Sequence, residues 1–328
     1  MLTVNVRPPL NSRMMLFGRP LRFYSPSTNE ATGYGRLGKA CMEALNMIHV
    51  SPIDYPDFVL TNPMSVEVSP IRFTMWEPDQ LPPTAQGFKH ARALIVPCSM
   101  NVKLFRESGY RGPIHLINLW GEASWSPLPS GDFFKFICIG RDNGIKSRKG
   151  IGELIEWFSL AFPKEKDVRL TIKSNPECER RVISDPRITV IYDDLPKAEY
   201  EQMVSEHHCG VFLSGLEGWN FPACELMAAN RPSIIVPWGG PADFTTHETS
   251  WHLEYTMVQA PQEPPYFGCG RGAKPTKDSV IAALREAYYN RSLLKSKAEA
   301  SYKASLGFSK QRFKERLRVV ALDAISNV

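Results

Sequence analysis

The 328-residue sequence contains no apolar run near the ~20 residues that span a bilayer. Its longest apolar runs, such as 93–96 and 234–236, have the length of a single strand. The first residues, MLTVNVRPPLNSRMM, lack a long apolar stretch after a charged start and contain two prolines. We therefore expect neither a membrane-spanning helix nor a secretory signal, and hence a cytoplasmic protein.

Patterns that hold metals are also missing. The seven cysteines are odd in number and form no CxxC pair, which disfavours a disulfide framework and a structural zinc site. Neither HExxH nor an EF-hand loop occurs. We therefore expect a chain that uses no metal and no cofactor.

Net positive charge is confined to one segment near the end of the sequence. Residues 295–318 carry eight Lys or Arg and two Glu, whereas the net charge of the whole chain is only +5. The rest is nearly neutral, which argues against a nucleic-acid footprint over the whole surface. Contact of the basic segment with nucleic acid or with an anionic membrane surface stays open, beside a simply solvated face.

What is present is a repeated alternation of short apolar runs and longer amphipathic segments, typical of parallel βαβ units. In the first half we expect strands at 21–24, 57–60, 71–76, 93–96 and 114–118, and helices at 35–47 and 102–108. In the second half we expect strands at 135–139, 169–173, 188–191, 210–213 and 233–237, and helices at 152–161, 197–207 and 222–229. These series predict an α/β protein with two doubly wound, Rossmann-like domains.

A segment rich in Pro, Ser and Gly, residues 125–131, separates the two series. We therefore predict domains over 1–126 and 127–305. The Pro- and Gly-rich stretch 259–277 predicts a long irregular loop. Residues 306–328 predict a final helix with an apolar face that includes Phe313 and Leu317.

In open parallel sheets, ligands bind beyond the carboxyl ends of the strands. The stretch FYSPSTNEATGYGRLGKA places Gly33 and Gly35 between the first strand and its helix, where backbone amides can face an anion. GYG alone is a weak signal, so a plain turn and a ligand loop both stay open.

The stretch FICIGRDNGIKSRKG has the same position in the second half. It carries Arg141, Lys146, Arg148 and Lys149 between a strand and a helix. Guanidinium and ammonium groups there can neutralise a diphosphate. A solvated basic loop is the alternative.

The stretch EGWNFPACE puts Glu217 in the loop after a strand, and Glu225 about one turn into the helix that Pro222 begins. Both acids can accept hydrogen bonds from diols, and amides near Asn220 and Phe221 can face a phosphate. A helix-capping Glu225 with a solvated Glu217 stays open, and a hydrolytic acid pair is less favoured because the spacing does not fix its geometry.

Two further stretches end in the same region. In TMWEPDQLP, Trp76 and Glu77 follow a first-domain strand, so Glu77 can meet a hydroxyl group or form a structural hydrogen bond. The diglycine turn of VPWGGPADF, at 239–240, is either a pocket wall or a plain tight turn.

Together these features resemble the nucleotide-sugar-dependent glycosyltransferases of family 4, which have the GT-B fold. The resemblance rests on the order of GYG, GR…RKG and E-x7-E, and extends to TMWEPDQLP, IVPCSMNVKLFRESGY and LPKAEYEQM. It covers about residues 20–325. It implies two domains that face a central cleft, and a C-terminal helix that crosses back to the first domain.

The resemblance also implies roles for the residues named above. It implies catalytic roles for Glu217 at the donor sugar, Arg141 and Lys149 at the diphosphate, and Gly35. It implies donor-binding roles for Gly33, Tyr34, Glu225 at the ribose, Asn220, Phe221 and Lys146. Glu77 is an acceptor-side candidate, because the sequence reads Met75-Trp76-Glu77 where many relatives have a histidine.

The expected function is therefore retaining, metal-independent sugar transfer from a nucleotide diphosphate sugar to a hydroxyl acceptor. A glycan or polysaccharide is the default acceptor, and a DNA base or a lipid is a lesser one. A nucleotide-sugar epimerase or hydrolase, and a non-catalytic nucleotide-sugar-binding protein, remain as alternatives.

Overall fold

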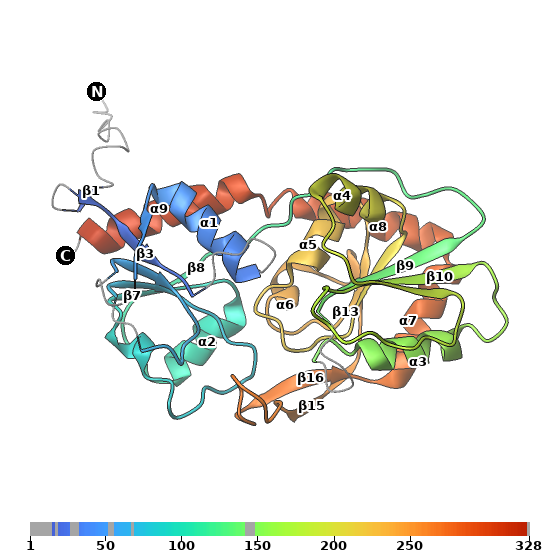
Figure 1. Ribbon diagram of the computed structural model, residues 1–328, viewed down its shortest axis with the longest axis horizontal. Helices are drawn as coiled ribbons and strands as arrows, with labels where there is room; N and C mark the ends of the chain where they lie inside the picture. The colour runs from blue at the N-terminus through green and yellow to red at the C-terminus, as the bar shows by residue number, and fades with distance from the viewer. Residues whose placement is uncertain are drawn as a thin grey trace.

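The structure is a computed structural model that describes residues 15–16, 19–26, 33–51, 56–66, 69–141 and 148–326. Two six-stranded parallel sheets lie side by side, each with helices packed on it (Figure 1). This confirms the predicted α/β architecture of two doubly wound domains. The expected strands and helices are present, with bounds shifted by a few residues.

The first sheet has the strand order β4-β3-β5-β6-β7-β8. Its elements are β3 Arg22–Tyr24, α1 Gly33–Leu45, β4 Ile48–His49, β5 Phe58–Leu60, β6 Ile71–Phe73, the 3-10 helix η3 Gly87–His90, β7 Ala93–Val96, α2 Ser99–Glu107 and β8 Ile114–Leu116. A short antiparallel pair, β1 Met15–Leu16 and β2 Arg19–Pro20, precedes it. The order reverses between β3 and β5, so a crevice is expected at their carboxyl ends.

The second sheet has the order β11-β10-β9-β12-β13-β14. Its elements are β9 Phe134–Ile139, α3 Ile151–Ala161, β10 Val168–Lys173, β11 Ile188–Ile191, α4 Lys197–Ser205, β12 Cys209–Phe212, α5 Phe221–Ala228, β13 Ser233–Ile235, α6 Pro241–Phe244 and β14 Ser250–His252. Two helices, α7 Lys277–Tyr289 and α8 Arg291–Ser305, complete the domain. Here the order reverses between β9 and β12, the strands that precede the basic loop and EGWNFPACE.

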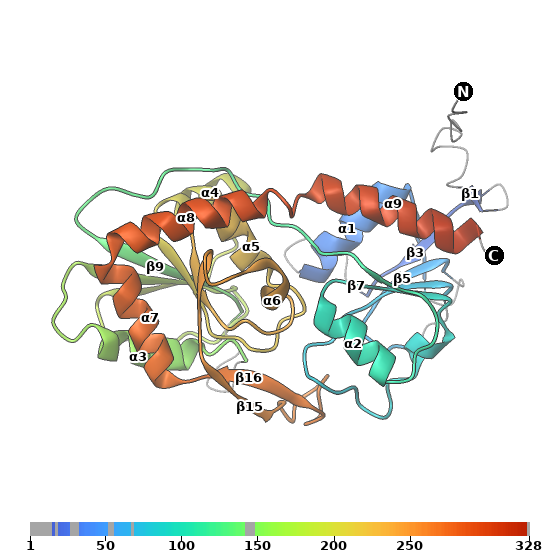
Figure 2. The same cartoon turned by 180° about the vertical axis from the view of Figure 1, so that it is seen from behind.

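The last helix, α9 Lys310–Ser326, crosses back and runs along α1 of the first domain (Figure 2). Lys314 pairs with Glu43 at 2.7 Å, and Nε of Arg318 donates to the carbonyl oxygen of Ala44 at 2.7 Å. On the apolar face, Phe313 is buried and packs against Phe73. The predicted crossing helix is thereby confirmed, and part of its positive charge neutralises the first domain rather than a partner.

The expectation of an irregular loop over 259–277 is wrong at both ends of that stretch. Strands β15 Tyr255–Gln259 and β16 Arg271–Pro275 pair into an antiparallel hairpin that reaches toward the first domain (Figures 1 and 2). At its far end Arg271 forms an ion pair with Asp79 at 3.0 Å. The pairing partner lies outside the stretch itself, so the local Pro and Gly content did not indicate a strand.

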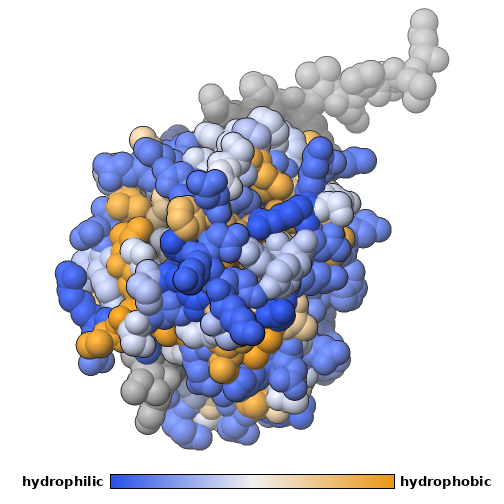
Figure 3. All heavy atoms as spheres, turned by 90° about the vertical axis from the view of Figure 1, so that its right-hand side faces the viewer, coloured by the Kyte–Doolittle hydropathy of each residue, from blue (hydrophilic) through white to orange (hydrophobic). Residues whose placement is uncertain are grey.

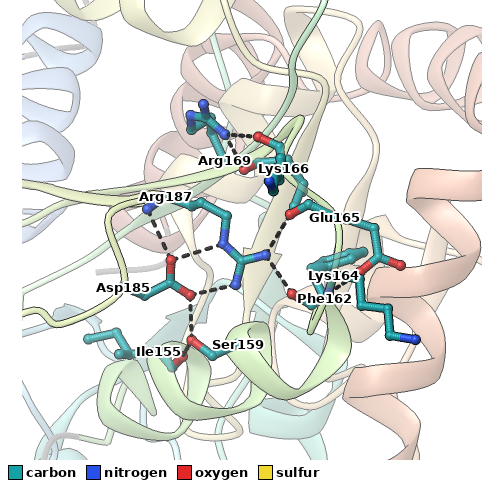
Figure 4. Close-up of polar contacts among 10 residues, drawn as sticks. Ile155, Ser159, Phe162, Lys164, Glu165, Lys166, Arg169, Asp185 and Arg187 are labelled. Carbon is teal, nitrogen blue, oxygen red and sulfur yellow. Dashed lines mark hydrogen bonds and ion pairs between the residues drawn. The ribbon is translucent and has the colours of Figure 1, made fainter.

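A polar cluster at the amino ends of β10 and β11, away from the carboxyl ends of the strands, stabilises the second domain (Figure 4). Arg187 donates from Nε and Nη2 to both carboxylate oxygens of Asp185, at 2.9 and 2.6 Å, and Nη1 reaches carbonyl oxygens after α3. Ser159 also donates to Asp185.

The outer end of this domain shows mostly hydrophilic side chains with small apolar groups between them (Figure 3).

Candidate functional site

The candidate site lies at the carboxyl ends of the two sheets, near the point in each sheet where strand order reverses. In the second domain, β9 leads to the basic loop and β12 leads to Glu217. In the first domain, β3 precedes α1 and β6 precedes Glu77. The carboxyl ends of both sheets therefore carry the polar groups singled out from the sequence.

Glu217 is the centre of a buried charge cluster. Its side chain is 6% exposed, its Oε1 accepts a hydrogen bond from Nζ of Lys149, and Nη1 of Arg148 lies 3.3 Å from the same oxygen. Burial would raise the pKa of Glu217, but the two cations outweigh burial and lower it. The cluster therefore brings a carboxylate together with an arginine and a lysine at the carboxyl ends of β9 and β12, where the strand order reverses.

Glycines fix the loop that carries Glu217. Gly239 has φ of +65°, and a Cβ there would lie 2.1 Å from the carbonyl oxygen of Glu217. On the other side, a Cβ at Gly215 would lie 1.8 Å from the carbonyl oxygen of Ala273 in β16. The diglycine turn and the hairpin thus enclose the loop between two close backbone approaches.

Helix α5 positions the second acid of EGWNFPACE. Asn220 caps the helix with its side chain, which accepts from the N–H of Ala223 at 3.2 Å, and Pro222 occupies the first turn. One turn on, Glu225 is buried and both of its carboxylate oxygens are occupied. Oε1 accepts from Arg36 of the first domain, and Oε2 accepts from the hydroxyl of Tyr200 at 2.8 Å.

The GYG stretch forms the first turn of α1 rather than a free loop. A Cβ at Gly33 would lie 3.5 Å from the ring of Phe221, so the start of α1 contacts the start of α5. The guanidinium of Arg36 lies over the same ring, 4.7 Å from its centroid. Gly35 is buried within this turn.

Gly38 completes a GxGxxG spacing with Gly33 and Gly35, which the sequence interpretation overlooked. Gly38 packs against the side chains of Phe23 and Leu60, where a Cβ would sit at 3.6 Å from each. In dinucleotide-binding folds the first glycine follows the strand at once, whereas β3 ends at Tyr24, well before Gly33. Here Gly38 serves the packing of α1 on the sheet, whereas Gly33 contacts α5 of the other domain.

Glu77 lies at a cavity of about 340 Å³ at the strand ends of the first domain. Its lining comprises Pro26, Tyr34, Asn62, Met75, Trp76 and Glu77, with Pro265 and Tyr266 from the hairpin loop. Burial raises the pKa of Glu77, the charge of Glu217 raises it further, and Arg148 and Lys149 partly oppose this. The charges of the Glu217 cluster in the second domain therefore act on Glu77 in the first domain.

Not every predicted site residue joins this arrangement. Arg141 is exposed and pairs with Glu177 at 3.5 Å, rather than with the Glu217 cluster. Lys146 lies outside the described residues. Lys149, Glu217 and Glu77 interact as one group of charged side chains. Glu225 belongs to a second group, in which Arg36 of α1, the helix that carries Tyr34, pairs with Glu225 and covers the ring of Phe221.

Three side chains at the site were not singled out from the sequence: Arg36, Tyr200 and Tyr266. Arg148 was visible as a member of the basic loop, but the direction of its side chain was not. Arg36 directly follows GYG, and that adjacency was an available signal. Tyr200 and Tyr266 reach the acids only through tertiary contacts.

Two features are absent from the described part of the chain. No group of three or more His, Cys, Asp or Glu side chains is placed to hold a metal ion there. Of the helices described, none combines the length and the apolar character needed to cross a bilayer.

No protein-family model and no curated protein matches the sequence. Solved structures match its fold. A glycosyltransferase from Rickettsia africae ESF-5 superposes with a TM-score of 0.65 over 94% of this chain and 99% of its own, at 12% identity. Sucrose-phosphate synthase from Thermosynechococcus elongatus gives 0.61 over 88% of this chain and 77% of its own, at 14% identity.

The pneumococcal O-GlcNAc transferase GtfA, solved with UDP and GlcNAc, gives a TM-score of 0.61 over 88% of this chain at 11% identity. This chain covers only 60% of GtfA, and 54% of TarM, another match. At such low identity the likeness defines the fold alone. That fold is GT-B, the two-domain architecture of these glycosyltransferases.

Proposed function

We propose that this chain is a retaining, metal-independent glycosyltransferase of the family 4 type that acts in the cytoplasm. It transfers a sugar from a nucleotide diphosphate sugar to a hydroxyl acceptor. One observation carries the proposal: the Glu217–Lys149–Arg148 cluster lies at the carboxyl end of the second sheet, where its strand order reverses, and its charges act on Glu77 at the cavity of the first domain. The GT-B fold of the structural neighbours supports it.

The proposed donor site lies in the second domain. Lys149 and Arg148 neutralise the diphosphate, and Glu217 accepts hydrogen bonds from hydroxyls of the donor sugar. Glu225 accepts hydrogen bonds from the ribose hydroxyls, beside the backbone at Asn220 and Phe221. Arg141 can join the diphosphate only if it leaves Glu177.

In the proposed reaction, the bond between the anomeric carbon and the diphosphate oxygen breaks. The acceptor oxygen bonds to the same face of that carbon, which retains its configuration. The acceptor proton passes to the leaving diphosphate, so no protein nucleophile is needed. The chain contributes positioning, and Arg148 and Lys149 stabilise the charge that develops on the leaving group.

The proposed acceptor site is the cavity of the first domain. Aromatic rings of Trp76 and Tyr266 and the carboxylate of Glu77 line it, a combination that suits a sugar ring with hydroxyl donors. A glycan or polysaccharide precursor is the proposed acceptor. A DNA base or a lipid at a membrane surface remains the lesser proposal, tied to the basic residues of 295–318.

A stepwise experiment tests this function. A thermal-shift panel of nucleotide diphosphate sugars identifies the donor, because a ligand at 100 times its Kd stabilises by about 2.7 kcal/mol. The labelled donor is then incubated with an acceptor panel in the presence of EDTA, and NMR reads the anomeric configuration of the product. We expect retained configuration, full activity in EDTA, and loss of transfer in Glu217→Gln.

Each alternative gives a different result. Rapid consumption of the donor without an acceptor would indicate a hydrolase, and conversion of its sugar would indicate an epimerase. Donor binding without turnover across the panel would indicate a binding protein. No stabilisation by any nucleotide diphosphate sugar would remove the basis for the donor site.

A further inference from the structure

Arg36 and Glu225 form an ion pair between the two domains. Arg36 extends from the first turn of α1, and Glu225 from α5 of the second domain. The start of α1 points toward the second domain (Figure 1). The guanidinium also covers the ring of Phe221, 4.7 Å from its centroid, so Arg36 is held by charge and by the aromatic face.

In this ion pair, Arg36 already occupies the carboxylate of Glu225, which the proposed function assigns to the ribose hydroxyls. The Glu225 side chain is 4% exposed, Arg36 takes its Oε1, and Tyr200 takes its Oε2. A buried carboxylate needs partners, because leaving one unpaired in the interior is costly. Ribose hydroxyls are donors of the same kind, so they must compete with the guanidinium for Oε1.

We propose that Arg36 is an internal competitor of the donor ribose. The inference rests on the proposed donor site. Arg36 holds Oε1 of Glu225 when the site is empty, and yields it to a ribose hydroxyl when the nucleotide binds. After transfer, Arg36 returns to Oε1 and favours release of the nucleoside diphosphate product. The same exchange breaks and re-forms an ion pair between the two domains.

Competition for Oε1 of Glu225 predicts that Arg36 weakens the contribution of the ribose hydroxyls to binding. In the wild type, the hydroxyls gain Glu225 but break an existing ion pair, so their net contribution to affinity is small. Without Arg36 they meet a carboxylate that keeps only Tyr200, so their contribution is large. The discriminating quantity is the ratio of the Kd of a 2′,3′-dideoxynucleoside diphosphate to that of the matching ribonucleoside diphosphate.

Isothermal titration calorimetry measures this ratio for the wild type and for Arg36→Met. The nucleoside diphosphates of the four bases and their dideoxy analogues are the probes. We expect the ratio to rise about tenfold in Arg36→Met, a change of about 1.4 kcal/mol in coupling. The cycle cancels any effect of Arg36 that acts equally on both ligands, such as a contact with the phosphates or a wider cleft.

Arg318→Met is the matched control. It removes an arginine of α9 that contacts the other end of α1, at the Ala44 carbonyl, and should leave the ratio unchanged. If Arg36→Met does not fold, Arg36→Gln repeats the cycle. A ratio that stays constant or falls in folded Arg36 variants would overturn the competition while the donor site stands. Failure of every variant and the wild type to bind any ribonucleoside diphosphate would overturn the donor site itself.

Discussion

The N–H of Gly240 donates a 3.0 Å hydrogen bond to the carbonyl oxygen of Glu217, which joins the diglycine turn to the loop that carries the central acid. Gly239, at φ of +65°, allows this approach, because a Cβ there would meet the same oxygen at 2.1 Å. We expect Gly239→Ala to cost about 1–2 kcal/mol for the backbone conformation alone. The clash adds to this cost and displaces Glu217.

The expected outcome is a lower melting temperature and a fall in kcat/KM of at least about 100-fold, the scale of a lost catalytic hydrogen bond. Gly109→Ala is the control. Gly109 also has a positive φ, +91°, but a Cβ there would have nothing within 4 Å. Equal losses of activity in the two variants would show that backbone strain, and not the position of Glu217, is responsible.

Substitutions of the two acids of EGWNFPACE should impair different steps of the proposed reaction. Glu217→Ala removes the proposed contact with the transferred sugar, so turnover should fall by about 10²–10³-fold. It also releases Lys149 and Arg148 from their partner, so the Kd for the nucleoside diphosphate should not rise. Glu225→Ala removes the proposed ribose contact, so its main effect should be a higher Kd for the donor rather than a lower turnover. Steady-state kinetics and calorimetry separate the two, and negligible effects of both would contradict the site.

Periodicity and turn residues were sufficient to predict the two sheets, because strand and helix patterns are local. They also located Glu217 and Glu225, because a loop acid after β12 and an acid one turn into α5 have few possible positions. The partners of these acids were not predictable. Arg36 reaches Glu225 from the other domain, and Arg148 rather than Arg141 turns toward Glu217. Both contacts depend on how the domains and the basic loop pack.

The β15–β16 hairpin also could not be predicted from the local sequence. Local Pro and Gly content indicated a loop over 259–277, whereas β16 is specified by its pairing with β15 and by the contact of Ala273 with Gly215. Tyr266, between these strands, completes the cavity of Glu77. Non-local pairing overrides local composition when a strand has a nearby edge to bind.

Asp185 should contribute acid-sensitive stability without affecting activity. Hydrogen bonds from Arg187 lower the pKa of Asp185 strongly, and Ser159 adds to this (Figure 4). A lowered folded pKa gives stability that is present above the unfolded pKa of about 3.9 and is lost as the pH falls through the folded pKa. We expect Asp185→Asn to lose about 1.5–3 kcal/mol at pH 7.

Denaturant titrations at a series of pH values test this. The difference between the wild type and Asp185→Asn should shrink as the pH falls below about 3.9. The cluster joins the end of α3 to the segment before β11, away from the strand ends of the site, so kcat and KM should be unchanged. A difference in stability that does not vary with pH would contradict the assigned role of the charge.

Glu77 should show the opposite dependence on pH. Burial and the negative charge of Glu217 raise its pKa, and the nearby Arg148 and Lys149 oppose them only in part. The folded protein therefore binds this proton more tightly than the unfolded chain. Its favourable contribution is complete below the unfolded pKa of about 4.3 and is lost as the pH rises through the folded pKa.

Glu77→Gln keeps the shape and hydrogen-bonding capacity of the side chain but cannot ionise. We expect this variant to gain stability relative to the wild type as the pH rises from about 4.3, by up to about 1.4 kcal/mol for each unit by which the pKa is raised. In the proposed reaction, ionised Glu77 accepts a hydrogen bond from the acceptor hydroxyl and orients it, while the proton itself passes to the leaving diphosphate. The acceptor kcat/KM of the wild type should therefore rise with pH over the same range, and Glu77→Gln should be slower and lack this rise. A variant that kept the wild-type pH profile would show that another group controls it.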